Sequence, residues 1–294
     1  MTVPDLILQT PAKINWVLEV LRRRDDGFHE LALVFQAVDL WDELSFEKIQ
    51  RGIEFSIAES PAPLAADESN LVSKAARLFF TETGLREGAR ITLKKRIPLA
   101  AGLGGGSSDA AATLLGLNQL FETGLSDGIL QALAAQLGSD VPFFLKGGTA
   151  LGTGRGEILE SWPPAPGISL VLANPGLELS TPKVYQSGKA LWTDGRRAGD
   201  FQKTLKSGKA ALLAADLFNG LEPAAFHLLP EVESLKNSIL QAGALGALVS
   251  GSGPTVFGLA GDRAQAREIA ERLRGKGATI WEVETIAEGP RRKA

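Results

Sequence analysis

The stretch that decides the fold is Pro98-Leu99-Ala100-Ala101-Gly102-Leu103-Gly104-Gly105-Gly106-Ser107-Ser108. It follows the alternating residues 91–95, which predict a strand, and it leads into residues 107–121, which are apolar nearly all round and predict a buried helix. Glycines let the backbone approach an anion closely, and the helix adds the partial positive charge of its N-terminal end. The loop therefore predicts a site for a phosphate chain, with Ser107 and Ser108 as further hydrogen-bond donors.

Two common phosphate-binding patterns do not match this loop. The dinucleotide fingerprint needs a third glycine where Ser107 stands, and the P-loop needs Gly-Lys-Ser or Gly-Lys-Thr, which the sequence lacks. The alternative is a simple connector between strand and helix. Three consecutive glycines, Gly104–Gly106, would be an unfavourable choice for a connector alone, because each glycine loses much conformational freedom on folding.

Outward from the loop, the first half of the chain predicts mixed strands and helices. A charged turn is expected at 22–27, and a hairpin in Gly147–Glu160 with Gly154-Arg155-Gly156 at its bend. The other predicted elements are strands near 14–21, 31–46 and 53–57, a helix from 69 or 70 to Gly84, a helix at 126–137, and a short helix that starts at Asp140 with Pro142 in its first turn.

The proline-rich stretch Trp162–Pro166 is the predicted linker, so we expect domains at 1–162 and 163–294. After the linker the predicted order is strand 169–173, helix 182–192, further helices to about 241, strands 247–250 and 255–259, helix 263–274 and strand 279–286. This order predicts an α+β protein, in which a mixed N-terminal domain is followed by an antiparallel sheet with helices on one face.

Composition narrows the possible functions. The 294 residues include no cysteine and only two histidines, His29 and His227, which excludes disulfides, thiolate metal sites and a cysteine nucleophile. The net charge of -3 does not indicate a nucleic-acid partner, and the Arg291–Lys293 tail is interpreted as solvated. Because Pro4, Asp5 and Gln9 interrupt the first stretch and no apolar run is long enough to span a membrane, we expect a cytoplasmic protein.

Three segments together resemble the GHMP kinase superfamily, which includes galactokinase, homoserine kinase and mevalonate kinase. Pro98–Ser108 resembles its ATP loop, Pro11-Ala12-Lys13-Ile14-Asn15 its N-terminal motif, and Val249–Val256 its third, glycine-rich motif. The three segments stand in the family's order and span nearly the whole chain. The resemblance implies the two-domain GHMP kinase architecture and an ATP-dependent kinase of a small alcohol.

Further segments resemble one branch of this superfamily. They are Gly27-Phe28-His29, Leu137–Phe144 and Gly152–Glu157, taken together with Pro11–Asn15. Members of that branch phosphorylate the 2-hydroxyl of 4-diphosphocytidyl-2-C-methyl-D-erythritol in the non-mevalonate isoprenoid pathway. The resemblance thus implies ATP and a cytidine diphosphate-linked alcohol as the two substrates.

The resemblance also assigns roles to two charged residues. Asp140 matches the aspartate that takes the proton of the substrate hydroxyl, and Lys13 matches a lysine that pairs with it. The pair would keep the carboxylate ionised and stabilise developing negative charge. The alternatives are a helix cap for Asp140 and a solvent-directed lysine at a strand edge for Lys13.

The remaining residues implied by the resemblance would contact the two substrates. Asn15, Phe28, His29, Thr181 and Tyr185 form the expected substrate set, with a cytosine ring between Phe28 and Tyr185 and its edge at His29. Phe28 stands where the branch commonly has tyrosine. Asn70 would touch the adenine end, although capping of the predicted helix explains it equally well.

The metal is implied only in part. Magnesium should accompany ATP, but many superfamily members have a metal-binding serine where this chain has Gly105 and Gly106, so the protein ligand of the magnesium ion stays unknown.

Three other functions stay open: a kinase of homoserine or a mevalonate-like alcohol, a nucleotide-binding protein without catalysis, and, more remotely, a serine hydrolase. Lys13 and Asp140 argue against a non-catalytic protein, and no serine lies in a Gly-x-Ser-x-Gly elbow. The sequence does not give the oligomeric state.

Overall fold

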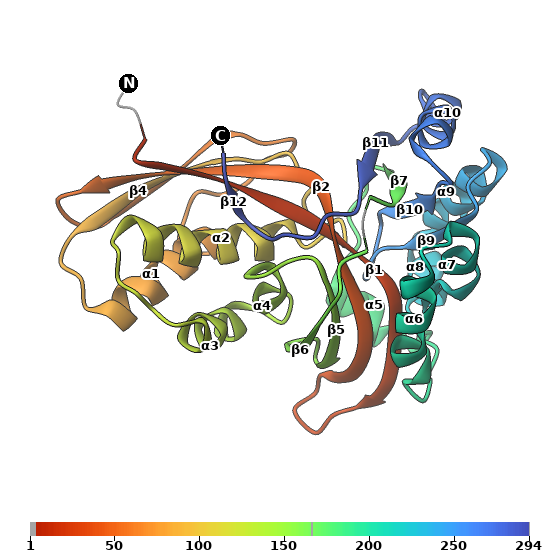
Figure 1. Cartoon of the computed structure of the whole chain (residues 1–294), viewed down its shortest axis with the longest axis horizontal. Coiled ribbons are helices and arrows are strands. Elements are labelled where there is room, and N and C mark those ends of the chain that lie inside the picture. Colours follow the sequence, from red (N-terminus) through yellow and green to blue (C-terminus); the bar gives the residue numbers. More distant parts are fainter. Residues whose placement is uncertain (1–3, 166, 294) are drawn as a thin grey trace.

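The computed structural model describes residues 4–165 and 167–293 and has two sheets, each with helices packed on it (Figure 1). The larger sheet has the strand order β12-β1-β2-β4-β3, and β5, β6 and β8 join it at its sides; the smaller sheet has the order β11-β7-β10-β9. This is the two-domain mixed fold that the sequence predicts. None of the helices within the described residues is long and apolar enough to cross a membrane.

The two longest strands of the structure pair with each other at the centre of the larger sheet. They are β1 (Leu6–Arg23) and β2 (His29–Ile49), which pair along nearly their whole length, with register shifts that bend them. The strands run from the larger sheet to a hairpin turn that lies beside the C-terminal half (Figure 1). The remaining strands of this sheet are β3 (Ile53–Glu59), β4 (Gly88–Lys94), β5 (Thr149–Gly154), β6 (Ile158–Trp162), β8 (Phe218–Asn219) and β12 (Arg291–Arg292).

Four helices cover one face of this sheet (Figure 1). They are α1 (Leu71–Thr83), α2 (Gly105–Leu120), α3 (Asp127–Leu137) and α4 (Val141–Phe144). Their starts and ends follow local signals: Asn70 caps α1 by accepting from the N–H of Val72, and Gly84 ends the helix with a left-handed backbone. The predicted helices and the hairpin in 147–160 are therefore confirmed.

The smaller sheet is antiparallel and is covered on both faces. Helices α9 (Pro230–Gln241) and α10 (Arg263–Leu273) pack on one face, and α6 (Arg196–Ser207), α7 (Ala210–Asp216) and part of β1 lie against the other. The remaining elements are strands β7 (Ser169–Asn174), β9 (Gly246–Val249), β10 (Val256–Leu259) and β11 (Thr279–Glu284), and helices α5 (Thr181–Gln186) and α8 (Glu222–Leu228). The predicted face with helices is confirmed, and a second covered face was not predicted.

Several boundaries differ from the prediction; for example, α2 starts at Gly105, two residues before the predicted start. The helix expected at 182–192 ends at Gln186, because Gly188 takes a left-handed backbone with φ of 69°. The predicted linker begins with the last residue of β6, Trp162, and carries no helix or strand over 163–165; Trp162 and Ala165 are buried, and its last residue, Pro166, lies outside the described residues. The domain division at 162/163 stays a prediction.

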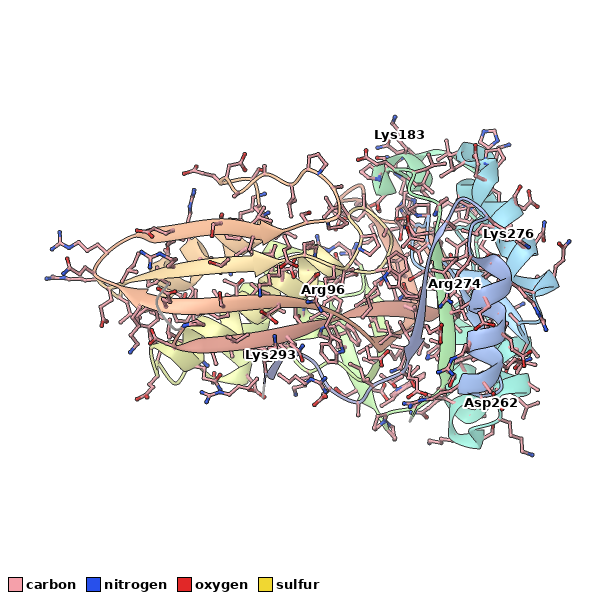
Figure 2. The ribbon with its side chains drawn as sticks, turned by 90° about the horizontal axis from the view of Figure 1, so that it is seen from above. Arg96, Lys183, Asp262, Arg274, Lys276 and Lys293 are labelled. Atoms are coloured by element: carbon pink, nitrogen blue, oxygen red, sulfur yellow. The ribbon has the colours of Figure 1, made fainter. Side chains whose placement is uncertain are left out.

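A C-terminal strap, Ile286–Lys293, returns from the smaller sheet to the larger one (Figure 1). The backbone N–H of Ile286 donates to Ala37 O, and β12 pairs with the start of β1. Lys293 bonds Glu43 at 2.6 Å and lies on the N-terminal half, whereas Asp262, Arg274 and Lys276 lie at the opposite end (Figure 2). The sequence did not predict this strap.

Candidate active site

A cavity of about 750 Å³ is lined by residues from both halves of the chain. The glycine loop forms one part of the lining, β1 contributes another, and the turn before β2 and helix α5 form the aromatic end. The expected site residues found in the lining are Lys13, Asn15, Phe28, His29, Pro98–Gly102, Gly104–Ser107, Asp140, Thr181 and Tyr185. The fold thus brings together most of the residues that the sequence singled out.

Lys13 and Asp140 are close enough to form an ion pair within this cavity. The Lys13 Nζ lies 3.6 Å from Asp140 Oδ2 and donates a hydrogen bond of 2.8 Å to Asn15 Oδ1. Asp140 precedes α4 but makes no side-chain cap, so helix capping does not account for it. Burial lowers the pKa of the Lys13 ammonium, and the charge of Asp140 opposes that effect.

One polar group beside this pair has no partner. Nδ2 of Asn15 is buried and makes no hydrogen bond to any described residue, while Asn15 itself lines the cavity. A buried donor without an acceptor is unfavourable. The Asn15 amide is therefore suited to a ligand that brings an acceptor oxygen.

The glycine loop is fixed from two directions. Gly102 and Gly104 take left-handed backbones, with φ of 73° and 70°. The Lys13 N–H donates to Leu103 O at 3.0 Å, and Ser250 Oγ donates to Gly102 O at 2.9 Å. The third motif therefore packs directly against the loop, although the two are far apart in sequence.

Three residues that we assigned to ATP lie elsewhere. Ser108 is fully buried, and its hydroxyl donates to Pro11 O at 2.6 Å, so it ties α2 to β1. Leu103 is buried in the core between the two sheets. Asn70 caps α1 and also donates to Ala65 O. Of the two serines, Ser107 is the one that the structure places in the lining.

The aromatic end has a different pairing from the expected one. Tyr185 stacks on His29, with ring centroids 4.9 Å apart, and the Arg155 guanidinium covers the Phe28 ring at 4.8 Å. Phe28 is 53% exposed, so its ring is accessible to a ligand. Burial lowers the pKa of His29, with a further contribution from the positive charge of Arg23, so its imidazole is neutral at pH 7.

Sequence reasoning missed two members of this site. Arg155 was given no role in the site, although it lies in the predicted hairpin bend and in the branch segment Gly152–Glu157. Strand β5 pairs with β2 so that Gly154 lies opposite Leu31, which brings the bend to the aromatic end. Ser252 shares a 2.7 Å hydrogen bond with Thr181 and lines the cavity. The antiparallel hairpin was a usable signal for Arg155, whereas no local signal linked Ser252 to Thr181.

Within residues 4–165 and 167–293, no group of three or more histidine, aspartate or glutamate side chains could hold a metal ion. The arrangement offers instead a loop for phosphates, a lysine–aspartate pair and stacking rings. These features suit transfer of a phosphoryl group to a hydroxyl.

Comparisons with known proteins agree with this arrangement. Two family profiles match the chain: "GHMP kinases N terminal domain" at residues 70–148 and "GHMP kinases C terminal" at residues 201–279. A protein of Pelotomaculum thermopropionicum named 4-diphosphocytidyl-2-C-methyl-D-erythritol kinase is 49% identical over 90% of this chain and 92% of its own length. A protein of Moorella thermoacetica with the same name is 46% identical over 91% of this chain and 95% of its own length.

Solved structures give the same result. A crystal structure of 4-(cytidine 5'-diphospho)-2C-methyl-D-erythritol kinase superposes with a TM-score of 0.82 and 37% identity, over 95% of this chain and 99% of the other. A homoserine kinase from Cytophaga hutchinsonii superposes with a TM-score of 0.79 over 100% of this chain and 99% of the other, but at 23% identity it shows the fold alone.

Proposed function

Since this chain belongs to the GHMP kinases, in the 4-diphosphocytidyl-2-C-methyl-D-erythritol kinase branch, we propose that its cavity holds ATP at the glycine loop and the cytidine substrate at the aromatic end. The chain is an ATP-dependent kinase. It transfers the γ-phosphoryl group of ATP to the 2-hydroxyl of 4-diphosphocytidyl-2-C-methyl-D-erythritol, a step of isoprenoid biosynthesis.

The observation that carries this assignment is the place of Lys13 between the two ends. Its backbone N–H bonds the glycine loop at Leu103, and its ammonium pairs with Asp140. On the other side lies Tyr185. Burial raises the pKa of its phenol, and the negative charge of Asp140 raises this pKa further. The pair is thus adjacent both to the proposed phosphates and to the proposed cytidine end.

In the proposed reaction the substrate hydroxyl oxygen attacks the γ-phosphorus of ATP. A new P–O bond forms, the bond to the β-phosphate oxygen breaks, and ADP leaves. Asp140 receives the hydroxyl proton, and Lys13 balances the negative charge on the reacting oxygens. Positioning contributes most to such a reaction, because phosphoryl transfer requires little covalent chemistry from the protein.

At the other end, Phe28 and Tyr185 are proposed to stack on the cytosine ring. Neutral His29 can donate one hydrogen bond and accept another, which suits the mixed edge of cytosine. The free amide of Asn15 is proposed to donate to an oxygen of the alcohol, and Thr181 to contact the linking phosphates. His29 now stacks on Tyr185, so the base would have to displace it or bind beside it.

Magnesium is proposed to enter as the complex of ATP. The described residues form no metal site by themselves, so the phosphates would supply the main ligands. The ion would neutralise charge on the phosphates, and no protein ligand is assigned to it.

A cytoplasmic location is proposed from the use of ATP as phosphoryl donor.

A kinase assay with a panel of alcohols tests the function. The purified chain should phosphorylate the cytidine-linked alcohol in the presence of ATP and magnesium, and homoserine and mevalonate should be inert. Turnover of homoserine or mevalonate instead would move the chain to another branch of the superfamily. ATP binding with no turnover of any alcohol would indicate a non-catalytic protein.

A further inference from the structure

A buried group of three charged side chains lies directly beneath the glycine loop. We call Asp42, Lys95 and Asp109 the buried trio. Lys95 Nζ pairs with Asp42 Oδ2 and lies 2.6 Å from Asp109 Oδ2. The side chains are between 0% and 4% exposed, so water screens their charges little.

The buried trio connects the two ends of the loop. Asp42 lies on β2, and its Oδ1 also accepts the backbone N–H groups of Arg96 and Ile97, at 2.5 and 2.9 Å, just before the loop. Asp109 lies on α2, just after the loop. The Lys95 ammonium is packed against Gly105, because a Cβ added there would lie 2.8 Å from Nζ.

The charges of the buried trio do not balance if every group is ionised. Two carboxylates and one ammonium give a net charge of minus one next to a loop that would bind a triphosphate. Burial raises the pKa of Asp109 to about 8; the nearby Lys95 lowers it and the negative charge of Asp42 raises it. Oδ1 of Asp109 has no hydrogen-bond partner among the described residues, so its carboxylate is poorly stabilised.

Other charged groups around α2 do not compensate Asp109. From β1 and the start of α4, Lys13 and Asp140 pair with each other. The charged residues of α1 and α3 are exposed; they are Lys74, Arg77, Glu82 and Asp127. Lys95 and Asp42 are therefore the charged groups that decide whether Asp109 holds a proton.

We propose that Asp109 is a positioning residue of the ATP site, and that the loop binds ATP tightly only while its carboxyl group is protonated. In that state the charges of Lys95 and Asp42 cancel, and the amides of the loop and the N-terminal end of α2 act on the phosphates unopposed. When Asp109 loses its proton, an uncompensated negative charge lies under Gly105 and repels the triphosphate. This inference rests on the proposed placement of ATP in the loop.

The expected effect follows from the titration of one group. With a pKa raised to about 8, Asp109 is expected to be mostly protonated at pH 7 and mostly ionised at pH 9. ATP affinity should therefore fall by up to about tenfold over this range. Binding at pH 9 should also take up close to one proton, because it restores the protonated state.

Isothermal titration calorimetry with a non-hydrolysable ATP analogue and magnesium tests this at pH 7, 8 and 9. Two buffers of different ionisation enthalpy report the protons taken up. The wild-type chain should lose affinity with rising pH, and Asp109→Asn, which cannot ionise, should change less than about twofold between pH 7 and 9. Asp127→Asn, on the exposed first turn of α3, is the matched control and should follow the wild type.

Two results would overturn the proposal. One is an affinity of the wild-type chain for the ATP analogue that does not change from pH 7 to 9; this result would overturn the proposal without any variant. The other is an Asp109→Asn chain, folded by circular dichroism, that keeps the wild-type pH dependence and proton uptake, since another group such as Lys13 would then be responsible. Kinase turnover of the wild-type chain in the alcohol panel, measured separately, shows whether the proposed function itself holds.

Discussion

Lys13 is buried with two oxygen partners, Asp140 at 3.6 Å and Asn15 at 2.8 Å. Burial favours the neutral amine and the carboxylate favours the ammonium, so the pKa of Lys13 depends on Asp140 being ionised. Loss of Asp140 would therefore remove the proposed proton acceptor and also lower the pKa of Lys13 further. The two residues are expected to act as one unit, with non-additive effects on turnover.

Asp140→Ala should lower kcat by at least about 10²-fold, the usual scale for a positioned acid–base group. ATP affinity should change little, because Asp140 lies outside the glycine loop. Steady-state kinetics and ATP titration of the folded variant measure the two effects. A variant with nearly wild-type kcat would remove Asp140 from the mechanism.

Tyr185→Ala should weaken binding of the cytidine substrate by roughly 5- to 150-fold, since a stacked base contributes on the order of 1–3 kcal/mol. The loss should appear mainly in KM for that substrate, because the base is remote from the transferred group. Tyr185→Phe keeps the ring and is the matched control, with a mild effect expected. Should Tyr185→Ala weaken ATP and spare the cytidine substrate, the stacking role is misassigned.

At the scale of single residues, the sequence predicted which residues belong to the site better than it predicted whether each side chain faces the cavity. Lys13, Asn15 and Asp140 were chosen from motifs, and the fold places them together. Ser108 stands in the same glycine-rich motif as Ser107, but one helix position later its hydroxyl faces β1 and bonds Pro11 O. Which of the two adjacent serines faces the cavity depends on where α2 starts. The sequence predicted this start at residue 107, two residues after the observed start at Gly105.

Elements with strong local signals were predictable. Asn70 and Gly84 mark the two ends of α1, and both act as predicted. The strand-loop-helix order around 98–108 was also correct. Helix α5 was predicted too long, because the apolar residues Leu191 and Trp192 were interpreted as part of it, whereas they are exposed beyond Gly188.

Gly105→Val should abolish measurable ATP binding. We attribute the effect to the support of the loop, since a Cβ at this position would lie 2.8 Å from both Lys95 Nζ and Ile97 Cγ2. A valine would push the start of α2 away from the buried trio. Calorimetry with ATP, and circular dichroism to confirm folding, measure the result. Normal ATP binding by the folded variant would mean that the loop is only a connector.

At the scale of the whole molecule, contacts between distant segments were beyond the sequence. The buried trio joins residues 42, 95 and 109, and no motif pairs Asp42 with the other two. Likewise, the Arg291–Lys293 tail was interpreted as solvated, and its residues are exposed, but the sequence did not predict that the Arg291 guanidinium lies 4.2 Å from the Trp41 ring or that Lys293 pairs with Glu43. Such contacts follow from topology, which periodicity and local propensity do not determine.

The C-terminal strap also supports the segment that carries Asp140. A Cβ on Gly289 would lie 2.6 Å from Phe144 O, at the end of α4. Gly289→Ala should therefore destabilise the chain by about 1–3 kcal/mol and lower kcat, because it moves the strap or α4. Urea unfolding and steady-state kinetics measure these changes.

Gly199→Ala is the matched control for this prediction. The same methyl group meets nothing within 4 Å at Gly199, in α6, and should stabilise the helix by about 0.5–1 kcal/mol. If Gly289→Ala were as stable and as active as Gly199→Ala, the strap would have no supporting role.

The pairing of β12 with β1 has a consequence for synthesis on the ribosome. β1 starts at Leu6 and β12 at Arg291, so at about 5–20 residues per second the part of the β1 edge that β12 covers, at Leu8 and Gln9, waits roughly 15 to 60 s for its partner. During that time the unpaired edge can associate with other nascent chains. Slowing translation of the second half should therefore lower the yield of native enzyme.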